Sequence, residues 1–195
     1  MKFVVLSSSR GTTFQAILDR IADGSLTAKC LGLVSDNEKR GCVEKARDAK
    51  LPVKIVLKKK DESREEYDKR LDAAVRALGN ADIIAAIGWL YLLSPWFVQQ
   101  WKNRILNVHP SLLPLHPGLH AHEEVLKVKE TESGMTIHII NEALDEGEIL
   151  VQKSCSVLPS DTVETLKARV QALEKKWYPS ALEMIEKGEI RLPTI

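Results

Sequence analysis

Short apolar runs rich in β-branched residues alternate with amphipathic segments along the first half of the chain. The pattern predicts strands at 3–6, 30–34, 53–57 and 83–87, and helices at 14–21, 43–49 and 67–78. This alternation is typical of βαβ units, whose parallel strands form a sheet covered by helices. Every residue of 83–87 is apolar, which predicts a central strand buried on both faces. We therefore expect an α/β fold.

The pattern changes in the second half of the chain. Three further strands are predicted, at 105–108, 135–140 and 149–156. The last two are joined by the polar segment 142–147, so we expect a mixed sheet with a more looped C-terminal half. A long amphipathic helix is predicted from about 162 to 187, and Pro179 is expected to bend or divide it.

The composition is that of an ordinary folded domain, with 195 residues, 44% hydrophobic and 28% charged. The formal net charge of +1 lacks the basic excess that nucleic-acid binding requires. The three cysteines form no C-x-x-C pair, so we expect neither a disulfide framework nor a thiolate metal site, and a cytoplasmic location. No apolar run is long enough for a signal sequence or a membrane span, so we expect no membrane partner.

All five histidines fall between positions 109 and 138. His109 follows the strand predicted at 105–108, and the two-residue period of a strand puts Asn107 and His109 on one face. The carboxyl end of a central strand faces the crevice in which open α/β sheets bind ligands. Acyl transfer needs an amide to hold a developing oxyanion and an imidazole to donate to it or move a proton. Asp145 is the best candidate for the carboxylate that keeps this imidazole protonated near neutral pH.

The histidines of the Pro-rich segment that follows are expected to lie on the surface. They are His116, His120 and His122. His120 and His122 have Glu123 and Glu124 nearby, but the H-E-x-x-H spacing is absent. We therefore expect no metal site.

A polar turn at 7–13 joins the first predicted strand to the first helix. Free N–H groups and the helix dipole favour an anion such as phosphate at this place. The single Gly11 is a weaker signal than G-x-G-x-x-G, so an ordinary turn capped by Thr12 or Thr13 fits equally well. Asp36 ends the second strand, where dinucleotide-binding folds place a ribose-binding acid. A non-catalytic nicotinamide dinucleotide module is therefore a rival, which the missing glycines disfavour.

The residues around His109 form a longer motif, N-V-H-P-S-L-L-P at 107–114, followed by P-G-L-H at 117–120 and L-D at 144–145. This motif resembles the formyltransferases that use 10-formyltetrahydrofolate, and among them the glycinamide ribonucleotide formyltransferases of purine synthesis. The resemblance spans nearly the whole chain. Further matching positions are 63–68, 93–95, 134, 138 and 169–179.

The resemblance implies one domain over 1–195, with a Rossmann-like, mostly parallel sheet and helices on both faces. The half at about 1–100 would bind the nucleotide, and the half at about 101–195 would bind folate and carry catalysis. The implied reaction moves the formyl group of 10-formyltetrahydrofolate, a co-substrate, to the amine of 5′-phosphoribosylglycinamide. Its products are N-formylglycinamide ribonucleotide and tetrahydrofolate, in de novo purine biosynthesis. No metal and no partner beyond small molecules is implied, and the chain would act as a monomer or homodimer.

The resemblance also assigns roles to residues. The catalytic set is Asn107, His109 and Asp145. The phosphate of the ribonucleotide would be bound by Gly11, Thr12 and Thr13, and its ribose and glycinamide would be flanked by Gln171, Ala172, Leu173 and Glu174. Folate would be enclosed by Arg64, Leu90, Tyr91, Leu92, Leu93, Asn107, Asn141, Glu142, Ala143, Leu144 and Asp145. Without the resemblance, Leu90, Leu92 and Leu93 would fit a hydrophobic core equally well.

The sequence departs from the family pattern at a few of these positions. Thr13 stands where Asn is usual, Tyr91 where Arg is common, and Leu115 with His116 where Lys precedes an aromatic residue. We expect these changes to affect affinity more than chemistry. The alternatives are another formyltransferase or a hydrolase that uses the same donor, such as methionyl-tRNA formyltransferase or formyltetrahydrofolate hydrolase. Their additional domains are not expected in a chain of 195 residues.

Overall fold

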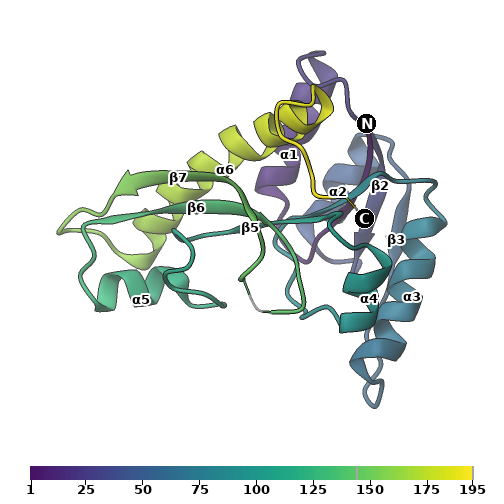
Figure 1. The fold of residues 1–195 in the computed structure, drawn as a ribbon, viewed down its shortest axis with the longest axis horizontal. Coiled ribbons are helices and arrows are strands. Elements are labelled where there is room, and N and C mark those ends of the chain that lie inside the picture. The colour runs from purple at the N-terminus through teal and green to yellow at the C-terminus, as the bar shows by residue number, and fades with distance from the viewer. Residues whose placement is uncertain (144, 195) are drawn as a thin grey trace.

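A computed structural model describes residues 1–143 and 145–194. Its sheet is built of the strands β1 Lys2–Leu6, β2 Lys29–Ser35, β3 Val53–Ile55, β4 Ile83–Ala86, β5 Ile105–His109, β6 Glu132–Ile139 and β7 Ile149–Ser156. The helices are α1 Thr12–Ala22, α2 Gly41–Asp48, α3 Arg64–Arg76, α4 Pro95–Gln100, α5 Ala121–Lys127 and α6 Val163–Glu186. The strand order is β3-β2-β1-β4-β5-β6-β7, parallel from β3 to β5 and antiparallel beyond it. In Figure 1 the hairpin of β6 and β7 extends away from the parallel strands.

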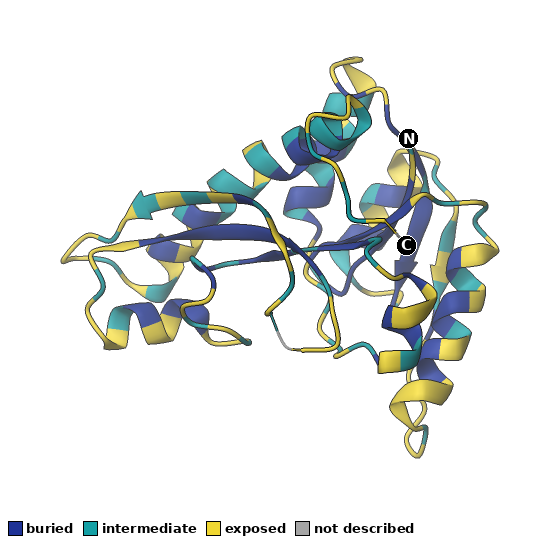
Figure 2. Ribbon diagram, viewed as in Figure 1, coloured by how far each residue is buried: buried dark blue, intermediate teal, exposed yellow. Residues whose placement is uncertain are grey.

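Alternate residues of the central strands supply two separate hydrophobic cores, one on each face of the sheet. On β1, Phe3 and Val5 pack with α1, α2 and α6, whereas Val4 and Leu6 pack with α3 and α4. The strands β1, β2, β4, β5 and β6 are mostly buried, whereas the edge strands β3 and β7 are largely not, and the helices expose their outer faces (Figure 2). A strand covered on both faces has no polar side, which explains the continuous apolar run at 83–87. The predicted α/β fold, with a Rossmann-like sheet and helices on both faces, is confirmed.

The structure corrects two local predictions in part. The segment expected as a Pro-rich surface loop contains α5, in which His122 is only 8% exposed. Pro179 does not divide the last helix, because α6 continues through it from Val163 to Glu186. Pro179 is buried, and the adjacent Tyr178 donates its hydroxyl to the carbonyl of Leu106 at 2.8 Å. Packing of this segment on the sheet outweighs the one helical hydrogen bond that proline removes.

The strand order reverses between β1 and β4, and the loops that follow these strands meet there. The backbone N–H of Ser8 donates to the carbonyl of Gly88 at 3.1 Å. Gly88 has a φ of 64°, and a Cβ at this position would lie 2.8 Å from the Cβ of Ser9. Such a switch point is where open α/β sheets form a ligand crevice. Within the described residues, no helix is both long enough and apolar enough to cross a membrane.

Candidate active site

The pairing of β5 with β6 gathers polar side chains at the carboxyl end of β5. The antiparallel register places Asn107 opposite His138 and His109 opposite Thr136. His109, Thr136 and His138 are buried, and Asn107 is half-buried. Because side chains alternate along each strand, this register brings both pairs to the same face of the sheet.

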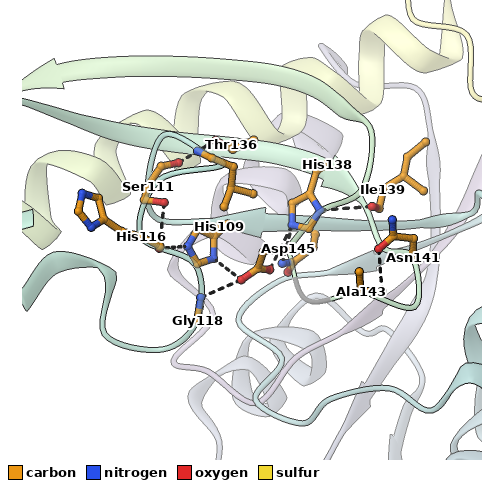
Figure 3. A network of polar contacts seen from close by, with 12 residues as sticks. His109, Ser111, His116, Gly118, Thr136, His138, Ile139, Asn141, Ala143 and Asp145 are labelled. Carbon is orange, nitrogen blue, oxygen red and sulfur yellow. Dashed lines mark hydrogen bonds and ion pairs between the residues drawn. The ribbon is translucent and has the colours of Figure 1, made fainter. Parts of the chain in front are cut away.

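The imidazole of His109 has an acceptor at each ring nitrogen (Figure 3). Its Nδ1 lies 3.3 Å from Oδ2 of Asp145, and its Nε2 lies 2.8 Å from the backbone carbonyl of His116. A carboxylate and a carbonyl carry no hydrogen to share, so the ring satisfies both contacts only with a proton on each nitrogen. The geometry therefore favours the positively charged imidazolium.

The contacts of His138 favour the opposite protonation state, a neutral ring. Its Nδ1 lies 3.3 Å from the carbonyl of Ile139, and its Nε2 lies 3.1 Å from Nδ2 of Asn107. Burial lowers the pKa of His138, although the nearby carboxylate of Asp145 opposes this effect. A neutral ring donates through Nδ1 and accepts the Asn107 amide at Nε2. The second N–H of that amide has no partner among the described residues and stays available to a ligand.

Asp145 connects these two histidines. Its Oδ2 accepts the backbone N–H of Gly118 at 2.9 Å in addition to facing His109, and its Oδ1 lies 3.6 Å from Nε2 of His138. Asp145 has a φ of 55°, a conformation that Asp tolerates better than most residues. Gly147 lets the loop return to the sheet, because a Cβ there would collide with the carbonyl of Ile139.

The residues predicted to bind the ribonucleotide phosphate lie at the start of α1. Gly11 is the N-cap, with a left-handed φ of 76°, and no side chain caps the helix. The expected alternative of a Thr12 or Thr13 cap is therefore wrong. The N–H groups of the first helical turn have no partner within the helix, which leaves them for an anion.

The first turn of α1 meets α6 through one side-chain contact. Thr13 donates its hydroxyl to Oε2 of Glu174 at 3.1 Å. Burial raises the pKa of Glu174 to about 7, although Thr13 and Lys167 both act to lower it. Two parts of the predicted ribonucleotide site are thus brought together. Of the remaining predicted residues, Gln171 is half-buried and Ala172 exposed, whereas Leu173 packs against the core.

The predicted folate residues come from segments that converge on α4. Leu90 and Leu92 are 51% and 54% exposed, so they are surface residues and not core, whereas Tyr91 and Leu93 pack on the α3–α4 core. Gln99 on α4 donates to Oε1 of Glu142 at 2.6 Å, which ties α4 to the exposed segment 141–143. The predicted Leu144 lies outside the described residues.

Arg64 differs from the other predicted folate residues. It is exposed on the first turn of α3, and its side chain forms no hydrogen bond or ion pair within the described part of the chain. The structure does not bring Arg64 into contact with the group around His109.

Comparison with known proteins decides the family. A family model described as formyl transferase matches residues 1–182. The chain belongs to the formyl transferase family.

Relatives within the formyl transferase family match nearly the whole chain. The phosphoribosylglycinamide formyltransferase of Haemophilus influenzae is 31% identical, over 98% of this chain and 90% of that protein. The trifunctional purine biosynthetic protein adenosine-3 of Bos taurus is 35% identical over 98% of this chain, which spans only 19% of that protein. The crystal structure of glycinamide ribonucleotide transformylase 1 from Symbiobacterium toebii is 33% identical, with a TM-score of 0.94, and covers 99% of this chain and 91% of that one.

The structure unites the three residues predicted as the catalytic set of this formyl transferase family member. Asn107, His109 and Asp145 meet around His138, which the sequence reasoning did not place in the site. The signal for His138 was present, since Thr136 and His138 are the alternate polar residues of the otherwise apolar part of β6 at 135–139. The backbone of Gly118 carries no side-chain signal, and only the folded loop shows its contact with Asp145.

The residues that could have supported a dinucleotide site, a metal site or a disulfide were also located in the structure. Asp36 is buried, and its carboxylate forms an ion pair with Arg40 at 2.7 Å. Within residues 1–143 and 145–194, no three His, Cys, Asp or Glu side chains lie where they could hold a metal ion together. The three cysteines are free thiols.

Proposed function

We propose that this protein transfers the formyl group of 10-formyltetrahydrofolate to the amine of 5′-phosphoribosylglycinamide. The observation that carries the proposal is the arrangement at the end of β5. An amide whose second N–H has no partner among the described residues stands beside an imidazole whose two ring nitrogens face the carboxylate of Asp145 and a backbone carbonyl. Family membership and the near-full-length match to phosphoribosylglycinamide formyltransferases support the same reaction.

The side chains have complementary roles in this proposal. Attack of the amine on the formyl carbon turns the carbonyl oxygen into an oxyanion of a tetrahedral intermediate. The free N–H of Asn107 donates to this oxygen, and the charge of His109 stabilises it. His138 accepts the other N–H of the amide and so fixes its direction. Collapse of the intermediate needs one proton moved from the attacking amine to the departing nitrogen, and His109 with Asp145 forms the pair that can carry it.

The two substrates are assigned to neighbouring loops. The phosphate would take the unpaired N–H groups at the start of α1, beside Thr13 and Glu174. Folate would lie against the exposed Leu90 and Leu92 and the loop that carries Asp145. The contact of Ser8 with Gly88 joins the loops after β1 and β4, which supports neighbouring positions for the two substrates.

The direct test is to mix the protein with both substrates and follow the release of tetrahydrofolate. Release that depends on the ribonucleotide, with formylated ribonucleotide as product, supports the proposal. Formate production without the ribonucleotide would instead indicate a hydrolase. Absence of turnover together with binding of a nicotinamide dinucleotide in a titration would indicate the dinucleotide module.

A further inference from the structure

The turn at residues 116–118 contacts both members of the His109–Asp145 pair through its backbone. The carbonyl of His116 accepts from Nε2 of His109 at 2.8 Å, and the N–H of Gly118 donates to Oδ2 of Asp145 at 2.9 Å (Figure 3). Two backbone groups of one turn thus fix the directions of both side chains. A shift of this turn would disturb both at once.

The turn has a conformation that needs support. His116 has a φ of 54°, in the left-handed region that few residues with a Cβ adopt, although Asn, Asp and His enter it more often than the others. The hydroxyl of Ser111 donates to the carbonyl of Leu115 at 2.5 Å and lies 3.2 Å from that of His116. These contacts hold the carbonyls but leave the side chain of His116 to be fixed by other groups.

The ring of His116 lies between two carboxylates on the far side of the turn. Its Nδ1 is 3.6 Å from Oε2 of Glu124 on α5, and its Nε2 is 3.6 Å from Oε1 of Glu130, which precedes β6. The side chain is only 13% exposed, and its Nε2 makes no hydrogen bond within the described residues. Figure 3 shows the ring pointing away from His109 while the carbonyl of the same residue faces it.

We propose that His116 is a positioning residue for the His109–Asp145 pair. Its ring anchors the turn to α5 and to the start of β6, and its carbonyl orients His109. Because the ring points away from His109 (Figure 3), we assign it no contact with either substrate. The proposal rests on the proposed function for the role of His109. It concerns a position at which this sequence departs from the aromatic residue expected from the family resemblance.

The test compares three variants with the wild type in steady-state kinetics. His116→Ala removes the ring, and His116→Asn removes it while tolerating the left-handed backbone. We expect both to lower kcat by about 10- to 100-fold, as for the loss of a group that orients a catalytic residue, with KM unchanged for both substrates. His116→Lys places a cation between the two carboxylates and should recover part of kcat.

His120→Ala is the matched control. His120 belongs to the same segment and lies 3.8 Å from Glu123, but its side chain is 77% exposed and has no contact with the catalytic pair. Its replacement should leave kcat unchanged. The double variant Glu124→Gln, Glu130→Gln keeps His116 and removes both carboxylates, so it tests the anchor even if His116→Ala folds poorly. We expect it to lower kcat in the same way.

Imidazole ¹⁵N NMR of His109 gives a readout independent of turnover. In the wild type both ring nitrogens should carry protons, and in His116→Asn the Nε2 proton should exchange faster. The inference is overturned if the His116 variants keep kcat within about twofold of an active wild type, or if KM rises instead. An inactive wild type would contradict the proposed function. The NMR comparison would still test whether the ring of His116 holds the turn that orients His109.

Discussion

Thr13 and Glu174 lie 161 positions apart in the sequence, and their side chains meet at 3.1 Å. The contact joins the first turn of α1 to the middle of α6. It places a half-buried carboxyl group beside the N–H groups assigned to the substrate phosphate. The contact also predicts how stability depends on pH, because burial raises the pKa of Glu174 to about 7.

Glu174 should make the protein less stable as the pH rises. Between its unfolded pKa of 4.5 and its folded pKa of about 7, the folded state holds more of the proton than the unfolded state does. The free energy of unfolding should therefore decrease through this range, by up to about 3 kcal/mol from this group alone. Urea unfolding of the wild type and of Glu174→Gln at several pH values measures the effect. The pH dependence should be weaker in the variant.

The control for Glu174→Gln is Glu189→Gln, which alters an exposed carboxylate beyond α6. It should keep the pH dependence of the wild type. If Glu174→Gln and the wild type showed parallel curves of stability against pH, the raised pKa would be contradicted.

Asn107→Ala removes the proposed oxyanion donor. We expect kcat to fall about 100- to 1000-fold, the usual cost of losing one such donor. KM for either substrate should change much less, because the donor acts on the oxyanion and not on the ground state. Asn80→Ala, at an exposed position after α3, should have wild-type kinetics. An Asn107→Ala enzyme with normal kcat would remove the amide from the mechanism.

Asp145→Asn keeps the size of the side chain and removes its charge. The Gly118 N–H can still bond the amide oxygen, but the charged form of His109 loses its counterion at Nδ1. We expect the rate to collapse while the affinity for a folate analogue changes little. Glu146→Gln, at the exposed neighbouring carboxylate, is the control. Wild-type kinetics in Asp145→Asn would falsify the pairing.

Gly11→Val is expected to weaken binding of the ribonucleotide and to spare a folate analogue, as calorimetric titration can show. The structure adds a folding cost, because a Cβ at Gly11 would lie 2.8 Å from the Cα of Cys42. Gly24 also has a positive φ, of 79°, but has nothing within 4 Å of an added Cβ. Gly24→Val therefore measures the cost of the backbone conformation alone. If the folded Gly11→Val protein lost affinity for both ligands equally, the phosphate assignment would be abandoned.

Treatment with a chelator should leave the formyl transfer rate unchanged. The expectation follows from the chemistry assigned to Asn107, His109 and Asp145, which needs no Lewis acid. The measurement is tetrahydrofolate release before and after dialysis against the chelator. A loss of activity that zinc restores would overturn it.

Local pattern was sufficient for most of the fold because strands and helices impose different periods on the sequence. The apolar run at 83–87 predicted a central strand, and β4 occupies Ile83–Ala86. The short helix α5 carries no local start signal, since its N-cap His120 makes no side-chain capping bond. Its formation depends on the packing of Val125 in the core, which a local pattern does not reveal.

The sequence by itself determined the fold class and the placement of Asn107 and His109 on one face of a strand, because both follow from periodicity. The tertiary structure alone decided which groups meet them. The register of β5 with β6 selected His138 as the partner of Asn107, and the return of the loop after β6 brought Asp145 to His109. These contacts join residues from separate elements, and their distances depend on how the strands pair and the loops close. No period along the chain encodes that pairing.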